Sequence, residues 1–137
     1  MTRAQRNCNP LNIRRVAATN WKGQRTRQAD RLFVQFRSNV WGFRAACCIL
    51  RTYAKRYKAV CLRDIVSRWA PPVENDTERY IQAVSLLSGL APLQPLSENE
   101  WPRLLQAMAW QESGHLFPLA EIEQGLALSR QASQSTY

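Results

Sequence analysis

The chain has 137 residues, which suffices for one hydrophobic core, so we expect a single domain spanning residues 1–137. Its hydrophobic share of 45% is normal for a globular protein. Nineteen Lys and Arg against ten Asp and Glu give a net charge of +9, which predicts a polyanionic partner. Nucleic acid, an anionic membrane and the bacterial cell wall all fit, and charge alone does not choose among them.

The sequence predicts that several features are absent. Its longest uncharged run is interrupted by Gly and Pro, so we expect no membrane span. Residues 1–7 are polar and basic, so we expect no secretory signal peptide and a protein made in the cytoplasm. The four cysteines lack the spacing of zinc ligands, so we expect reduced thiols, no metal and no cofactor. These cysteines are Cys8, Cys47, Cys48 and Cys61.

The N-terminal part of the chain predicts a small β-hairpin lobe that follows a flexible arm of residues 1–8. Residues 13–15, 21–24 and 32–36 have the composition of short strands. The polar residues 25–31 are expected to form the loop between the last two strands.

The remainder of the chain predicts five helices. Ser38 or Asn39 caps the first, in which apolar residues follow the i, i+3, i+4 spacing over residues 41–54. Arg44, Arg51 and Lys55 fall outside this stripe and are expected to be solvated. Two further helices are expected at residues 62–69 and 77–87. The next begins after a capping box formed by Ser97 and Glu100 and runs to about residue 114. The last helix is expected at residues 119–130, and residues 131–137 are expected to be flexible. The fold class is therefore mainly α (α+β).

One carboxyl group stands out near the end of an apolar helix. Residues 105–111 are mostly apolar, Glu112 follows, and Gly114 is placed to end the helix. Spacing alone favours Glu112 as the polar last residue of this helix. A carboxyl group on an apolar wall also has the raised pKa that general-acid cleavage of a glycosidic bond needs.

Three segments resemble lysozyme-like peptidoglycan-degrading proteins. Ala-Trp-Gln-Glu-Ser-Gly at residues 109–114 resembles the Glu-Ser motif of lytic transglycosylases and goose-type lysozymes, in which the Glu is the catalytic acid. Residues 71–84 resemble a later transglycosylase motif of Pro, Glu-Thr, Tyr-Val and Val. Residues 9–14, 21–24 and 33–36 resemble the region that follows the catalytic helix.

The order of these segments is rotated relative to the family, because the later motifs precede Glu112. The resemblance therefore implies a circularly permuted lysozyme-like domain, similar to small phage and prophage structural proteins. It implies cleavage of the MurNAc-GlcNAc β-1,4 bond of peptidoglycan glycan strands, with Glu112 as the catalytic residue. A single Glu fits a lytic transglycosylase better than a muramidase, which uses two carboxylates.

The substrate-binding residues that we expect come from the same segments. Tyr80 matches the Tyr of the Tyr-Val motif, and Ser113 matches the Ser after the catalytic Glu, although a buried core tyrosine and a carbonyl-capping serine are equally ordinary. Tyr53 is the nearest match to the family's Ala-Tyr-Asn motif. Three amides in the segments of the lower cleft could bond N-acetyl groups: Asn12, Gln24 and Gln35. Asp30 is the preferred second carboxylate if the hairpin lines the cleft, ahead of Asp64, Glu74 and Asp76.

Two alternatives to an enzyme remain open. The clustered Arg residues of 3–31 and 44–68 also fit a basic nucleic-acid-binding module, although no established motif of that class is present. The other alternative is a catalytically inactive structural protein that has the same fold and belongs to a virion or a secretion apparatus. An enzyme acting on the periplasmic cell wall without a signal peptide needs delivery by a phage virion or a secretion apparatus, and we expect a monomer.

Overall fold

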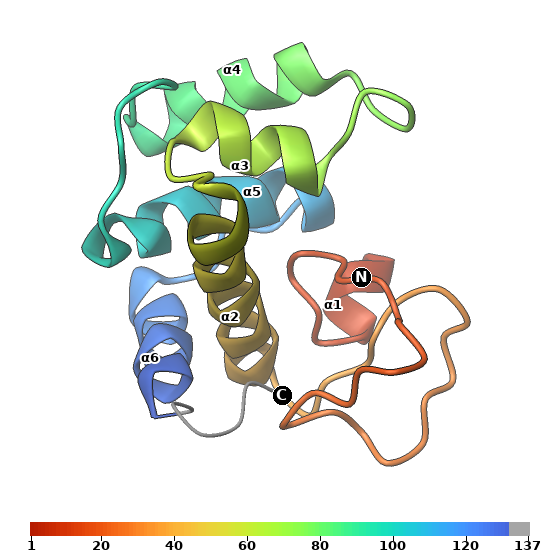
Figure 1. Ribbon diagram of the computed structural model, residues 1–137. Coiled ribbons are helices and arrows are strands. Elements are labelled where there is room, and N and C mark those ends of the chain that lie inside the picture. The colour runs from red at the N-terminus through yellow and green to blue at the C-terminus, as the bar shows by residue number, and fades with distance from the viewer. Residues whose placement is uncertain (132–137) are drawn as a thin grey trace.

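A computed structural model describes residues 1–131, and the protein is mainly helical in this part of the chain. No helix within residues 1–131 combines the length and the apolar character that a membrane crossing requires. The helices, shown in Figure 1, are α1 (Arg3–Arg6), α2 (Asn39–Tyr57), α3 (Leu62–Trp69), α4 (Thr77–Ser88), the 3-10 helix η1 (Glu98–Glu100), α5 (Trp101–Ser113) and α6 (Leu119–Arg130).

The predicted helices are confirmed, and the expected capping groups are present at several ends, but Ser38 at the start of α2 makes no capping hydrogen bond through its side chain. The Asp76 side chain accepts a hydrogen bond from the N–H of Arg79, and Gly89 ends α4 in the left-handed conformation. Ser97 and Glu100 form the expected capping box, but it opens η1, and Pro102 then occupies the first turn of α5. The flexibility expected for residues 132–137 concerns residues outside the described part of the chain.

Helix α5 contacts α1, α2, α4 and α6, and α6 packs along α2 (Figure 1). The two helices approach closely at Gly125, where an added Cβ would lie 2.7 Å from Phe43 Cβ and 2.9 Å from the N atom of Arg44. The prediction that Arg44 is solvated is wrong, because the side chain is 1% exposed. Arg51, also expected in solvent, is partly buried and forms an ion pair with Glu98 at 3.0 Å, whereas Lys55 is exposed.

The N-terminal residues 1–38 form a lobe of loops beside α2, drawn in red and orange in Figure 1. The arm expected at residues 1–8 is instead folded: Thr2 and Gln5 make a capping box for α1, and Ala4 is buried. The structure assigns no strand in residues 1–131. The segments expected as strands meet only through isolated bridges, Arg14 with Phe33 and Gln24 with Phe36.

Side chains replace the missing strand ladder of the lobe. The buried Asn9 accepts a hydrogen bond from the N–H of Ile13 and donates to the carbonyl groups of Ile13 and Val34. Asp30 accepts hydrogen bonds from the N–H groups of Leu32 and Phe33. These polar side chains satisfy backbone groups that a hairpin would otherwise pair, so the lobe is ordered without a sheet.

Candidate active site

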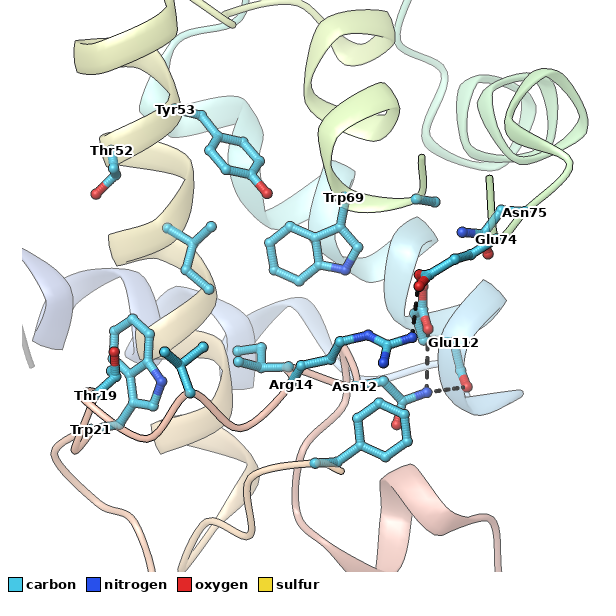
Figure 2. Close-up of a pocket in the computed structure, with 15 residues that line it drawn as sticks. Asn12, Arg14, Thr19, Trp21, Thr52, Tyr53, Trp69, Glu74, Asn75 and Glu112 are labelled. Atoms are coloured by element: carbon cyan, nitrogen blue, oxygen red, sulfur yellow. Dashed lines mark hydrogen bonds and ion pairs between the residues drawn. The ribbon is translucent and has the colours of Figure 1, made fainter. Parts of the chain in front are cut away.

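Glu112 lies in the last turn of α5, on the wall of a pocket of about 420 Å³. The pocket lies between the N-terminal lobe and the helices, and Figure 2 shows Glu112, Asn12 and Glu74 at one end, with Trp21 and Thr19 at the other. Lobe and helices both contribute to its walls. The lining residues are Asn12, Ile13, Arg14, Val16, Thr19, Trp21, Phe33, Ile49, Thr52, Tyr53, Trp69, Ala70, Glu74, Asn75 and Glu112.

Two side chains hold the Glu112 carboxyl group. The Tyr80 hydroxyl of α4 donates to Oε2 at 2.9 Å, and Asn12 Nδ2 is 3.2 Å from Oε1. Asn12 Nδ2 also lies 3.1 Å from the Glu112 carbonyl oxygen, one of the unpaired carbonyl groups at the end of α5. Asn12 has a φ of +52°, a conformation that Asn adopts more readily than most residues. Three distant segments therefore fix the orientation of this carboxyl group.

Burial raises the pKa of Glu112 above its ordinary value, because the charged form loses hydration. The hydrogen bonds from Tyr80 and Asn12, and the positive charge of Arg14, oppose this effect and favour the carboxylate. The pKa of Tyr80 is raised well above its usual range, first by burial and then by the negative charge of Glu112. Tyr80 therefore stays protonated at neutral pH and remains a hydrogen-bond donor.

A second carboxyl group, Glu74, lines the same end of the pocket (Figure 2). Arg14 Nη2 lies 3.3 Å from Glu74 Oε2, and both side chains are more than half exposed. Because Arg14 also acts electrostatically on Glu112, it stands near both carboxyl groups. The two acids thus differ in environment: Glu112 is mostly removed from solvent, and Glu74 is hydrated and paired with a cation.

Aromatic side chains line much of the remaining wall of the pocket. Trp69 Nε1 donates to the Leu11 carbonyl oxygen at 3.3 Å, which fixes the indole ring. Tyr53 packs against this ring in an edge-to-face arrangement with 6.3 Å between ring centroids. Burial raises the pKa of Tyr53. Ring faces beside a few polar groups are typical of pockets that hold small organic ligands.

The structure places five of the expected site residues outside the pocket lining, and of these Tyr80 still reaches the Glu112 carboxyl group. Ser113 is 1% exposed and donates to the Ala109 carbonyl oxygen at 2.7 Å, so its side chain bonds to its own helix. Gln24 Oε1 accepts from the N–H of Trp21, and Gln35 bonds to Asn7 and to the N–H of Ala29. The Gln24 and Gln35 side chains thus hold the lobe together and do not line the pocket.

Asp30, the expected second carboxylate, also lies outside the pocket lining. Its carboxylate pairs with Arg3 at 2.7 Å and accepts from Asn7 at 2.9 Å. The Arg3 guanidinium, first among these contacts, holds the pKa of Asp30 far below its ordinary value. A carboxylate fixed inside the lobe in this way is unavailable as a second catalytic group.

Sequence reasoning ranked Glu74 behind Asp30 and did not single out Arg14 or Trp69. No local pattern marks these residues, because they reach the pocket only through the packing of the lobe against α3 and the loop that follows it. Tyr80 and Asn12 were expected to bind substrate, and the structure places both against Glu112. Within residues 1–131 there is no group of three His, Cys, Asp or Glu side chains that could hold a metal ion.

The fold and site define a mainly helical protein with a partly buried carboxyl group on the wall of an aromatic pocket. No family model matches the chain. It is 38% identical over 126 residues to protein P5 of Pseudoalteromonas phage PM2, an alignment that covers 90% of this chain and 79% of the phage protein. The chain therefore belongs to the same family as that phage protein.

Proposed function

We propose that the protein is a peptidoglycan-cleaving glycosidase that acts on the MurNAc-GlcNAc β-1,4 bond, as a lytic transglycosylase with Glu112 as its single acid and base. The observation that carries this proposal is the environment of Glu112. A carboxyl group with a raised pKa, oriented by two hydrogen bonds and lining a pocket, has the properties of a general acid.

The proposed reaction needs only this one carboxyl group. Glu112 gives its proton to the glycosidic oxygen as the C1–O bond breaks, which leaves the carboxylate facing a positively charged sugar. The carboxylate then takes the proton of the 6-hydroxyl group of the same sugar, whose oxygen bonds to C1 and closes a 1,6-anhydro ring. Glu112 ends protonated, as it began, and no water is consumed.

The residues around Glu112 and the other residues of the pocket wall have supporting roles in this proposal. Tyr80 and Asn12 hold the carboxyl group in place through both steps, so both are positioning residues. The aromatic rings of Trp69 and Tyr53 provide faces on which sugar rings pack. Glu74 is the candidate for a second carboxylate, and it would serve as a general base if the product were hydrolysed instead of cyclised.

The proposal includes a circularly permuted lysozyme-like fold. The helix that carries the catalytic Glu comes fifth of the six α-helices described in residues 1–131, after the Tyr80 helix and the lobe. The relation to a phage protein supports the part of the proposal in which a virion delivers the protein to the periplasmic cell wall. If the protein does not cleave peptidoglycan, the alternative is a catalytically inactive structural protein of the same family.

Clearing of purified cell walls tests the proposal. We expect the wild-type protein to lower the turbidity of a cell-wall suspension, and Glu112→Gln to be slower by about 100-fold or more, because it has no proton to give. Glu123→Gln removes one negative charge from an exposed position of α6 and should clear at the wild-type rate. Equal clearing by Glu112→Gln would remove Glu112 from the mechanism.

A further inference from the structure

The positive charge of this protein is concentrated in the N-terminal lobe. Residues 1–38 contain nine of the nineteen Lys and Arg and one of the ten Asp and Glu, so they carry a net charge of +8. The remaining residues 39–137 carry +1. The single acid of the lobe, Asp30, is paired with Arg3 and bonded to Asn7. The excess charge of the protein is therefore a property of one part of the molecule.

Several cations of the lobe are exposed and have no acidic partner in the described chain. The loop of residues 24–37 contributes Arg27, Arg31 and Arg37, all exposed. No ion pair within residues 1–131 involves these three side chains, in contrast to the partnered Arg63 and Arg130 on the helices. Because no nearby carboxylate neutralises these exposed cations, they give the surface a positive electrostatic potential that attracts polyanions.

Exposed aliphatic side chains accompany these cations. Leu32, next to Arg31, is 51% exposed, and Val16 is 59% exposed. The N–H of Arg15 bonds to the Leu32 carbonyl oxygen at 2.8 Å, so the segments that carry Val16 and Leu32 lie side by side. Basic side chains flanking protruding aliphatic ones are typical of proteins that bind an anionic bilayer surface, with the cations at phosphate groups and the aliphatic tips among the upper acyl chains.

The same lobe lacks the features that recognise nucleic acid. Its aromatic residues are Trp21, Phe33 and Phe36; Trp21 and Phe36 are buried. Phe33 lies against the guanidinium groups of Arg3 and Arg14, at 4.8 and 5.8 Å from the ring centroid. Residues 1–38 therefore present no row of exposed aromatic rings on which successive bases could stack. The lobe has only the four-residue helix α1 and, within residues 1–38, no strand to enter a groove.

We propose that the N-terminal lobe docks the protein on the surface of an anionic phospholipid bilayer. The docking uses the unpaired Arg residues of the 24–37 loop and the exposed Leu32. It is independent of the catalytic proposal, because it requires no chemistry at Glu112. Since Arg14 and Val16 belong both to the lobe and to the pocket wall, docking would hold the pocket close to the membrane surface.

Co-sedimentation with lipid vesicles tests the docking surface. We expect binding to vesicles that contain phosphatidylglycerol, none to phosphatidylcholine alone, and weaker binding as salt rises. Arg27→Gln/Arg31→Gln/Arg37→Gln should weaken the apparent affinity about 100-fold, since each basic residue near an anionic surface contributes roughly fivefold. The control Arg56→Gln/Arg79→Gln/Arg103→Gln removes the same net charge from exposed positions on α2, α4 and α5 and should change the affinity less than about threefold.

A second pair of variants distinguishes binding to a lipid bilayer from binding to other polyanions such as DNA. Leu32→Ser should weaken vesicle binding about tenfold, also at high salt, and leave any affinity for duplex DNA unchanged. Leu93→Ser alters a side chain that is 72% exposed in the loop after α4, and it should bind vesicles like the wild type. Equal losses in the two triple variants, binding without anionic lipid, or DNA binding without vesicle binding would overturn the proposal. Glu112→Gln should bind vesicles normally, so failure of the catalytic proposal leaves this test intact.

Discussion

At Glu112, opposing influences set the pKa of the carboxyl group. Burial raises the pKa, and the hydrogen bond from Tyr80 is the largest of the effects that lower it. If Glu112 acts as a general acid, activity requires the protonated form and falls as pH rises through this pKa. The position of the alkaline limb of the pH profile therefore reports the environment of this one residue.

Removing the Tyr80 hydroxyl should move that limb in a defined direction. In Tyr80→Phe the carboxylate loses a donor, so the pKa of Glu112 rises further and the alkaline limb shifts to higher pH. The rate at the optimum should fall partially, by about tenfold, because the carboxyl group is less well oriented. The measurement is the pH dependence of cell-wall clearing, with Tyr57→Phe, an exposed tyrosine of α2, as control. A limb that moves to lower pH would contradict the assigned role.

Asp30 is a structural carboxylate, and its contribution to the free energy of unfolding should depend on pH. It accepts five hydrogen bonds from Arg3, Asn7 and the N–H groups of Leu32 and Phe33, and its pKa is depressed. A depressed folded-state pKa stabilises the protein above the unfolded value of about 4, and this stabilisation is lost as pH falls below it.

Asp30→Asn should therefore lower the free energy of unfolding by about 2 kcal/mol at neutral pH. The difference from the wild type should shrink below about pH 4, where the Asp30 carboxyl group of the unfolded wild-type chain begins to take up a proton while that of the folded protein stays ionised. Urea unfolding at neutral pH and below pH 4 measures this difference. The control is Asp64→Asn at an exposed position of α3, which should stay within about 0.5 kcal/mol of the wild type. A difference that grows in acid would show that the Arg3 pair is not the stabilising contact.

At the scale of elements, the helices were predictable and the lobe was not. Residues 62–69 and 119–130 were expected as helices with the bounds that the structure shows, because apolar spacing and capping residues act over one or two turns. The lobe depends on side chains that bridge about 20 residues or more, such as Asn9 to Val34 and Arg3 to Asp30. No short-range pattern encodes these contacts, and a strand-like composition there predicted a hairpin that did not form.

The residues of the candidate site also fall into those that local sequence patterns predicted and those that only the packing of distant segments brings together. Glu112 and Tyr80 were predicted from short motifs on two helices, and the structure joins them with a hydrogen bond. Glu74 and Trp69 belong to the pocket because α3 and its following loop face the lobe, which no local pattern predicts. The burial of Arg44 was missed for a related reason: the close approach of α6 covers a position that lies outside the apolar stripe of α2.

The contact between α2 and α6 should be sensitive to one added methyl group. Gly125→Ala gains about 1 kcal/mol of helix propensity, but its Cβ would lie within 3.0 Å of Phe43 Cβ and of the backbone of α2. Backbone atoms in a packed core yield little, so we expect a net loss of about 1 to 3 kcal/mol in the free energy of unfolding.

Thermal unfolding measures this loss, and Gln124→Ala, an exposed position of the same helix, serves as the control. Its melting temperature should stay close to that of the wild type. A stabilised Gly125→Ala would mean that α2 and α6 have room to separate.

At the scale of the whole molecule, the pocket is a junction between two parts of different character. The basic lobe supplies Asn12, Arg14 and Phe33, and the nearly neutral helical part supplies Trp69 and Glu112. The bonds from Asn12 to both the side chain and the carbonyl group of Glu112 tie the parts together. Binding of a polyanion by the lobe and chemistry at Glu112 are therefore expected to occur on one side of the molecule.

The most direct test of the central claim is mass spectrometry of the fragments released from purified peptidoglycan by the wild type and by Glu112→Gln. We expect fragments with 1,6-anhydro ends from the wild type and none from Glu112→Gln, whose melting temperature should confirm that it is folded. Reducing ends that depend on Glu112 and Glu74 together would indicate hydrolysis by two carboxylates. Release of the same fragments by Glu112→Gln, or no fragments from the wild type where a control transglycosylase works, would contradict the catalytic role of Glu112.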